Sequence, residues 1–91
     1  MDFEWDDAKA KRNLKKHKVS FDEAATVFYD ALSATGPDPD HSILESRWVT
    51  FGRSVLGRLL AVAHTDRDDA IRIISARVAT AAERAIYEKT V

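Results

Sequence analysis

Hydrophobic and polar residues alternate with two different periods along the chain, and this change of period predicts an α+β protein. Alternation of Phe3 and Trp5 with Glu4 and Asp6 predicts a short strand around residues 3–6, and apolar runs separated by turn segments predict three longer strands at residues 47–53, 59–65 and 70–77. Spacings of three and four predict helices at residues 8–17 and 20–29 and a terminal helix from residue 80. We therefore expect a short N-terminal strand, two helices, an antiparallel β-meander and a C-terminal helix.

Side chains suited to capping mark where these helices begin. Asp6 or Asp7 precedes the first helix, while Ser20 and Thr80 each have a glutamate three residues later, Glu23 and Glu83. In this capping-box spacing the hydroxyl accepts from the N–H of the glutamate, whose carboxylate reaches back to the N–H of the cap. Both boxes predict a helix start.

The segment between the second helix and the meander is predicted to be a turn-rich connection. Residues 31–45 contain Gly36, Pro37 and Pro39, which interrupt regular structure. A short strand around residues 32–35 is the one regular element that the pattern allows there.

The loop between the first two strands of the meander predicts their register. If Arg53 and Arg58 flank a four-residue loop, antiparallel pairing places Phe51 opposite Leu60, Val49 opposite Val62, and Arg47 opposite His64. In the third strand Arg72 and Arg77 have opposite parity, so a regular strand cannot direct both toward one pocket. Either a bulge or a position of Arg77 beyond the strand end is required.

Composition narrows the class of protein. The 91 residues, 45% hydrophobic and 32% charged, are ordinary for a single soluble domain spanning residues 1–91. The chain has no cysteine, which excludes disulfides and thiolate metal sites, and we expect no metal and no cofactor. The acidic start lacks a secretory signal pattern, and no apolar run approaches the roughly 20 residues of a membrane span. We expect a cytoplasmic protein without a membrane partner.

Charge is divided unevenly between the two halves of the chain. Residues 1–45 carry six basic and ten acidic side chains, whereas residues 46–91 carry eight basic and five acidic ones. Five of the six lysines lie between Lys9 and Lys18, and seven of the eight arginines lie from Arg47 onward. The planar guanidinium matches phosphate oxygens, so arginines concentrated on the strands suggest a phosphate ligand.

The candidate chemistry is metal-independent RNA cleavage, because the RNA supplies its own 2′-hydroxyl as nucleophile. The residues expected to act in catalysis are His64, Arg67, Arg72 and Arg77. Those expected to bind substrate are Arg47, Arg84 and Tyr87. Each has a structural alternative: a strand histidine is more often structural, Tyr87 packs by default, and the arginines have acidic neighbours at Asp66, Asp68, Asp69 and Glu83. For the lysine-rich first helix, a solvated face is favoured over an RNA-contacting one.

A family resemblance runs through almost the whole chain in the same order. It is carried by Phe3–Asp6, Lys16–Phe21, Ala24–Phe28, Asp38–Ser42, Gly52–Ser54, His64–Thr65 and Arg72–Arg77. These segments resemble the BrnT toxins, small ribonucleases of type II toxin-antitoxin modules with a RelE-like fold. The resemblance implies an endoribonuclease that inhibits growth. It also implies neutralisation by a BrnA-type ribbon-helix-helix antitoxin, through which the toxin meets DNA only indirectly, and a positively charged site on His64, Arg67, Arg72 and Arg77.

The sequence departs from the family pattern at several positions. Lys18 stands where a glycine is common, Asp7 and Ala31 stand where prolines are common, and Ala81–Ala82 replaces a pair that is often basic. The last change removes positive charge near the expected site and raises the question of an attenuated toxin. The alternative function is a non-catalytic module that binds RNA or an antitoxin.

Overall fold

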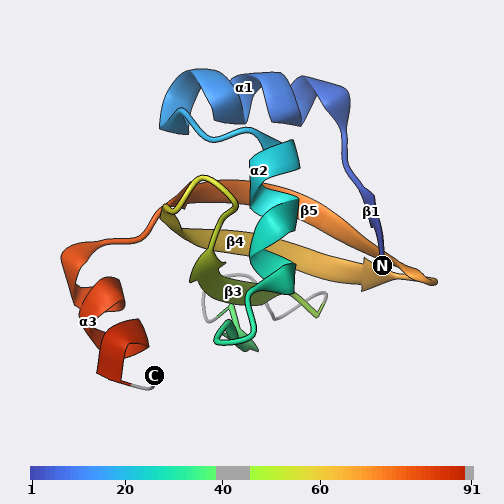
Figure 1. Ribbon diagram of the computed structural model, residues 1–91. Coiled ribbons are helices and arrows are strands. Elements are labelled where there is room, and N and C mark those ends of the chain that lie inside the picture. Colours follow the sequence, from blue (N-terminus) through green and yellow to red (C-terminus); the bar gives the residue numbers. More distant parts are fainter. Residues whose placement is uncertain (39–45, 90–91) are drawn as a thin grey trace.

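A computed structural model describes residues 1–38 and 46–89 of the chain and shows a five-stranded sheet flanked by helices (Figure 1). The strand order is β1-β5-β4-β3-β2, with β1 parallel to β5 and the other neighbours antiparallel. The strands are β1 (Asp2–Glu4), β2 (Ala34–Pro37), β3 (Trp48–Arg53), β4 (Leu59–Arg67) and β5 (Ala70–Val78). The helices are α1 (Asp7–His17), α2 (Phe21–Thr26), the 3-10 turn η1 (Val27–Tyr29) and α3 (Ala81–Lys89).

This arrangement confirms the predicted α+β fold with its short first strand, two helices, antiparallel meander and terminal helix. The strand expected around residues 32–35 is β2, which begins two residues later, at Ala34. Residues 39–45 of the predicted connection, including Pro39 and His41, lie outside the described residues. No helix in the described part of the chain is long and apolar enough to cross a membrane.

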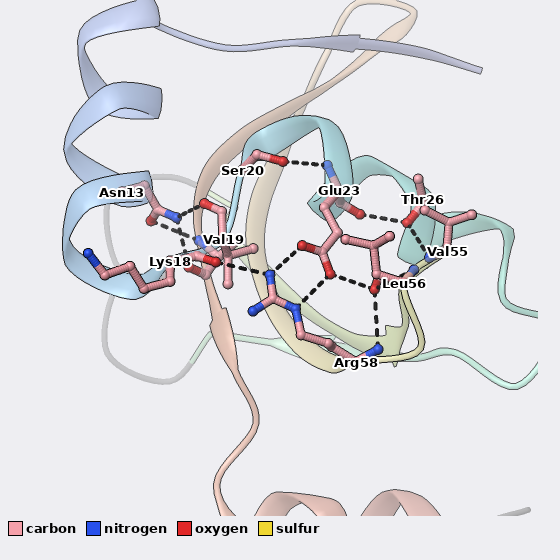
Figure 2. A network of polar contacts seen from close by, with 11 residues as sticks. Asn13, Lys18, Val19, Ser20, Glu23, Thr26, Val55, Leu56 and Arg58 are labelled. Atoms are coloured by element: carbon pink, nitrogen blue, oxygen red, sulfur yellow. Dashed lines mark hydrogen bonds and ion pairs between the residues drawn. The ribbon is translucent and has the colours of Figure 1, made fainter.

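Helix caps form as the sequence predicts, with one exception. Asp6 caps α1 by accepting from the N–H groups of Ala8 and Lys9, and Ser20 Oγ accepts from Glu23 N at 3.0 Å. The Glu23 carboxylate does not reach back to Ser20, because it is bound by Arg58 from the β3–β4 loop (Figure 2). Ser54 Oγ of the same loop also donates to it. That half of the prediction was wrong.

Two apolar clusters hold the layers together. In Figure 1, α2 lies over one face of the sheet, and this covered face contains the main core. Its buried members are Val19, Phe21, Ala24, Val27, Leu60, Val62, Ile73 and Ala76. Alternation along β4 places Leu59 on the opposite face, where it packs with Ala79, Tyr87 and Phe51 under α3. We call this second face the open face, because α3 covers it at only one end.

Helix α1 runs along the β5 edge of the sheet, and Asn13 joins the two. The Asn13 Nδ2 donates to Ala76 O at 2.8 Å and to Val19 O at 3.0 Å, while its Oδ1 accepts from Ala76 N at 3.1 Å. Strand β1 pairs with β5 only at residues 70–72, so the Asn13 amide satisfies backbone groups beyond it. The hydrophobic pattern of α1 gives no sign that Asn13 is buried.

The predicted register of the first hairpin was wrong by one residue. In the structure Phe51 lies opposite Ala61, Gly52 opposite Leu60, and Trp48 opposite His64. The loop holds five residues instead of four, because Arg58 leaves the strand to bind Glu23 with its Nε and Nη2 (Figure 2). Arg47 therefore does not face His64, and the two residues lie on opposite faces of the sheet.

The bulge that Arg72 and Arg77 required is present. The β4–β5 register shifts between Ala63 and His64, so that Thr65 pairs with Arg72 and Ala61 with Arg77. Thr65 and Ala61 share a face of β4, which places both arginines on the open face. Strand β5 continues to Val78, so Arg77 lies inside the strand and not beyond its end.

Candidate functional site

A cleft of about 520 Å³ lies at the open face beside the β4–β5 hairpin. Four cationic side chains line it: Lys9, Arg47, Arg67 and Arg72. They come from α1, from the residue before β3, and from the two strands of the hairpin. We call this the basic cleft. Ser46, Thr65, Asp66 and Ile74 complete its lining.

Hydrogen bonds from neighbouring strands position these cations. Thr65 Oγ1 donates to Ser46 O at 2.7 Å, which fixes the backbone before Arg47 against β4. Arg72 Nη1 donates to Glu4 Oε2 at 2.7 Å, across the β1–β5 pair. This bond uses one of the five guanidinium N–H groups, so the remaining donors of Arg72 stay available to a ligand.

The electrostatics of the basic cleft favour an anion with several oxygen atoms. Arg67 makes no ion pair with any described residue, and its side chain is exposed at the end of β4. Asp66 is the carboxylate in the described lining, and Glu4 binds Arg72 from outside it. Guanidinium groups bind phosphate oxygens in paired geometry, so a phosphodiester satisfies this arrangement.

His64 is not part of this lining. Its ring lies on the covered face, 6% exposed, with its centroid 4.9 Å from that of Phe28 in an edge-on contact. Its Nε2 shares a 2.7 Å hydrogen bond with Thr50 Oγ1, and Nδ1 has no partner within the described residues. Burial lowers the pKa of His64, against a smaller opposing effect of Asp66, and so favours the neutral ring.

Arg77 lies at a second cavity, of about 290 Å³, on the open face. Its guanidinium binds the Glu83 carboxylate through two bonds of 2.7 and 2.9 Å. This pair, helped by the bonds to Thr80 and opposed by burial, lowers the pKa of Glu83 to about 2. The ion pair with Glu83 that the sequence left as an alternative is therefore formed.

The two α3 candidates lie apart from the basic cleft. Tyr87 is 5% exposed, and its hydroxyl donates to Asp30 Oδ2 at 2.6 Å. Burial, followed by the bond to Asp30, raises the pKa of Tyr87. Arg84 is half-buried on the same helix and lines neither cavity.

Of the seven residues expected at the site, the structure thus gathers Arg47, Arg67 and Arg72. Sequence reasoning missed Lys9, because it treated the lysines of the first helix as a solvated face. Their spacing alone does not tell which of them faces the sheet. In the described part of the chain, no group of three or more histidine, aspartate or glutamate side chains is arranged to hold a metal ion.

The fold and the basic cleft define a small α+β protein that gathers cations at one end of an open sheet face. The protein-family model of BrnT, the ribonuclease toxin of type II toxin-antitoxin systems, matches residues 5–83. The chain therefore belongs to the BrnT family of ribonuclease toxins, and this membership implies an antitoxin partner and an RNA target.

The fold is shared with a solved member of the family. The 1.1 Å crystal structure of the Brucella abortus ribonuclease toxin BrnT superimposes with a TM-score of 0.69 and 22% sequence identity. The match covers 88% of this chain and 97% of that chain. A comparison with curated proteins finds no match.

Proposed function

We propose that this protein is a metal-independent endoribonuclease that cleaves RNA at the basic cleft by attack of the 2′-hydroxyl. The observation that carries the proposal is the convergence of Lys9, Arg47, Arg67 and Arg72 from separate elements on one cleft. A scissile phosphate bound there meets donors that stabilise the charge developing on its oxygens.

In the proposed reaction, the 2′-oxygen forms a bond to phosphorus while the bond from phosphorus to the 5′-oxygen breaks. Asp66 is the carboxylate that lines the basic cleft, and we propose that it accepts the proton of the 2′-hydroxyl as general base. The departing 5′-oxygen takes a proton from water, and the hydroxide that remains takes the proton from Asp66, which restores the carboxylate. The products are an end with a 2′,3′-cyclic phosphate and a free 5′-hydroxyl, and DNA is not a substrate because it lacks the nucleophile.

The proposal changes the parts of two residues that the sequence placed in catalysis. His64 becomes a structural residue, because its ring is buried under Phe28 and its Nε2 is occupied by Thr50. Arg77 holds the start of α3 through Glu83. Neither role requires contact with RNA.

The proposed biological setting is the cytoplasm, with a BrnA-type ribbon-helix-helix protein as the antitoxin. Such an antitoxin would bring the toxin to DNA only indirectly, through its own DNA-binding domain. Family membership supports an antitoxin partner, and co-purification with the product of the neighbouring reading frame tests its type.

Cleavage of a labelled RNA by the antitoxin-free protein in the presence of a chelator tests the reaction. Arg67→Ala and Arg72→Ala should each lower kcat/KM, and the loss should correspond to about 2–4 kcal/mol of transition-state stabilisation. Arg72→Lys should restore little of the loss, because an ammonium does not reproduce the guanidinium fork. Arg53→Ala, which removes an arginine outside the basic cleft, is the control and should retain activity.

Two further variants separate the candidates for proton transfer. Asp66→Asn should lower kcat, whereas His64→Ala should lower the melting temperature and leave the pH profile of kcat unchanged. Cleavage that needs added magnesium, or equal cleavage of a matched DNA strand, would contradict the proposal. RNA binding without cleavage would instead identify a non-catalytic module.

A further inference from the structure

Another hollow, of about 320 Å³, adjoins the basic cleft along the edge of the sheet. This hollow lies between α1 and β5, and we call it the α1 groove. Lys9 and Ile74 line both the α1 groove and the basic cleft, so the two form one continuous surface. The remaining lining of the α1 groove is Arg12, Asn13, Lys16, His17 and Ser75.

The cations of the α1 groove repeat on one side of the helix. Lys9, Arg12 and Lys16 are spaced by three and four residues, so their side chains share a face over about 10 Å of helix. Asn13 lies in the same row but is buried, because its amide is bound to Ala76 and Val19. It therefore fixes this face of α1 toward β5.

Charge in the α1 groove is of one sign. The described residues that line it include no aspartate or glutamate. Lys9 and Arg12 do interact electrostatically with Asp6, which caps the start of the helix. Arg12 and Lys16 have no ion-pair partner among the described side chains, so both are available to an external anion.

The β5 bulge connects the two hollows. Ile74 is the extra residue that the shifted register leaves between Ile73 and Ser75. Its half-buried side chain lines both hollows and gives their junction an apolar surface. A polyanion that extends from the basic cleft along this edge contacts Ile74 first and then the row of cations on α1.

We propose that the α1 groove binds the sugar-phosphate backbone of single-stranded RNA flanking the scissile phosphate. The inference rests on the proposed function, because the basic cleft supplies one end of the path. Contacts of this type go to phosphates, so the groove contributes affinity and placement without reading sequence.

The test compares two double variants that remove equal charge from the same helix. Arg12→Gln with Lys16→Gln removes the groove cations, and Lys11→Gln with Lys15→Gln is the matched control on other sides of α1. Lys11 lines a different hollow, beside Trp5 and Phe21, and Lys15 is exposed. Equal melting temperatures establish that all variants are folded.

Binding is measured with 2′-O-methyl oligoribonucleotides, which lack the nucleophilic hydroxyl. For a probe of about 12 nucleotides, the groove variant should bind roughly tenfold more weakly, and its salt slope should fall by about 1.4, which corresponds to two lost phosphate contacts. A probe of about three nucleotides, which fills only the basic cleft, should bind the groove variant and the parent equally.

The outcomes separate this inference from the function on which it rests. Failure of the parent protein to bind or cleave RNA would overturn the proposed function. RNA cleavage by the parent, with equal losses in the groove variant and the control, would overturn the inference alone. Unchanged RNA affinity with weakened antitoxin binding would assign the groove to the antitoxin interface instead.

Discussion

Glu83 is the residue whose ionisation is most strongly coupled to the fold. It accepts from Thr80 N at 2.9 Å to complete the cap of α3, and it binds Arg77 of β5 with both carboxylate oxygens. Its pKa of about 2 lies below the ordinary value of 4.5, chiefly because of Arg77. The ionised form is therefore stabilised by folding.

This depressed pKa predicts how stability changes with pH. A carboxyl with a lowered pKa contributes its full stabilisation above about 4.5 and loses it as the pH falls toward about 2. Because Arg77 is 41% exposed, solvent screening reduces the contribution to about 1–2 kcal/mol. Free energies of unfolding measured from pH 7 downward should show Glu83→Gln less stable than the parent at neutrality, with the difference shrinking in acid. A constant difference would show that Glu83 acts through packing alone.

The two capping boxes show what a short motif predicts at this scale. Both hydroxyls accept from the glutamate N–H, as expected. Only Glu83 also returns to the cap, whereas Glu23 binds Arg58, which is 35 residues away in the chain. Local spacing predicts the helix start, but it cannot predict a partner that the folded sheet brings to the carboxylate.

Among the elements, α1 carries a backbone strain at its C-terminal end. Lys18 has φ 60° and ψ 30°, the left-handed conformation that favours glycine. Its carbonyl accepts from Arg58 Nη2 at 3.0 Å, so this geometry is held from outside the helix (Figure 2).

Lys18→Gly should therefore stabilise the protein, by about 0.5–1 kcal/mol, because glycine adopts this conformation without the Cβ clash. The carbonyl bond to Arg58 is retained. Lys15→Gly, inside the same helix, should destabilise by about 1 kcal/mol and is the matched control. Chemical denaturation measures both, and a loss of stability in Lys18→Gly would show that the lysine side chain contributes more than the strain costs.

The positions of the strands were predictable from the sequence pattern, but the pairing between neighbouring strands was less so. The three meander strands and the two helices followed from the sequence pattern, and the parity of Arg72 and Arg77 required either a bulge or a position of Arg77 beyond the strand end, of which the structure has the bulge. The register of the first hairpin did not, because local sequence does not show that Glu23 binds Arg58 and keeps it in the loop. One residue of loop length moves every pairing and places Trp48, not Arg47, opposite His64.

For the molecule as a whole, the sequence predicted the cationic residue types of the site better than it predicted which residues lie together. Arg67 and Arg72 were expected from two cationic strands, and the basic cleft contains both. His64 was grouped with them because it is near in sequence, but strand alternation and η1 bury it under Phe28. Lys9 comes from the opposite end of the chain, and only the packing of α1 against β5 brings it to the cleft.

The placement of the basic cleft also predicts how an antitoxin inhibits the toxin. The cleft lies at the β4–β5 hairpin, and a partner that blocks RNA by occupancy must cover that end of the sheet with acidic or carbonyl groups.

Amide hydrogen exchange, measured on the free toxin and on its complex with the antitoxin, tests this prediction. Exchange in residues 65–72 should slow on binding, while the β3–β4 loop at the opposite end, where Val55 and Leu56 are exposed, should exchange as in the free protein. If RNA cleavage is abolished while the hairpin amides exchange unchanged, inhibition acts through conformation and not through occlusion.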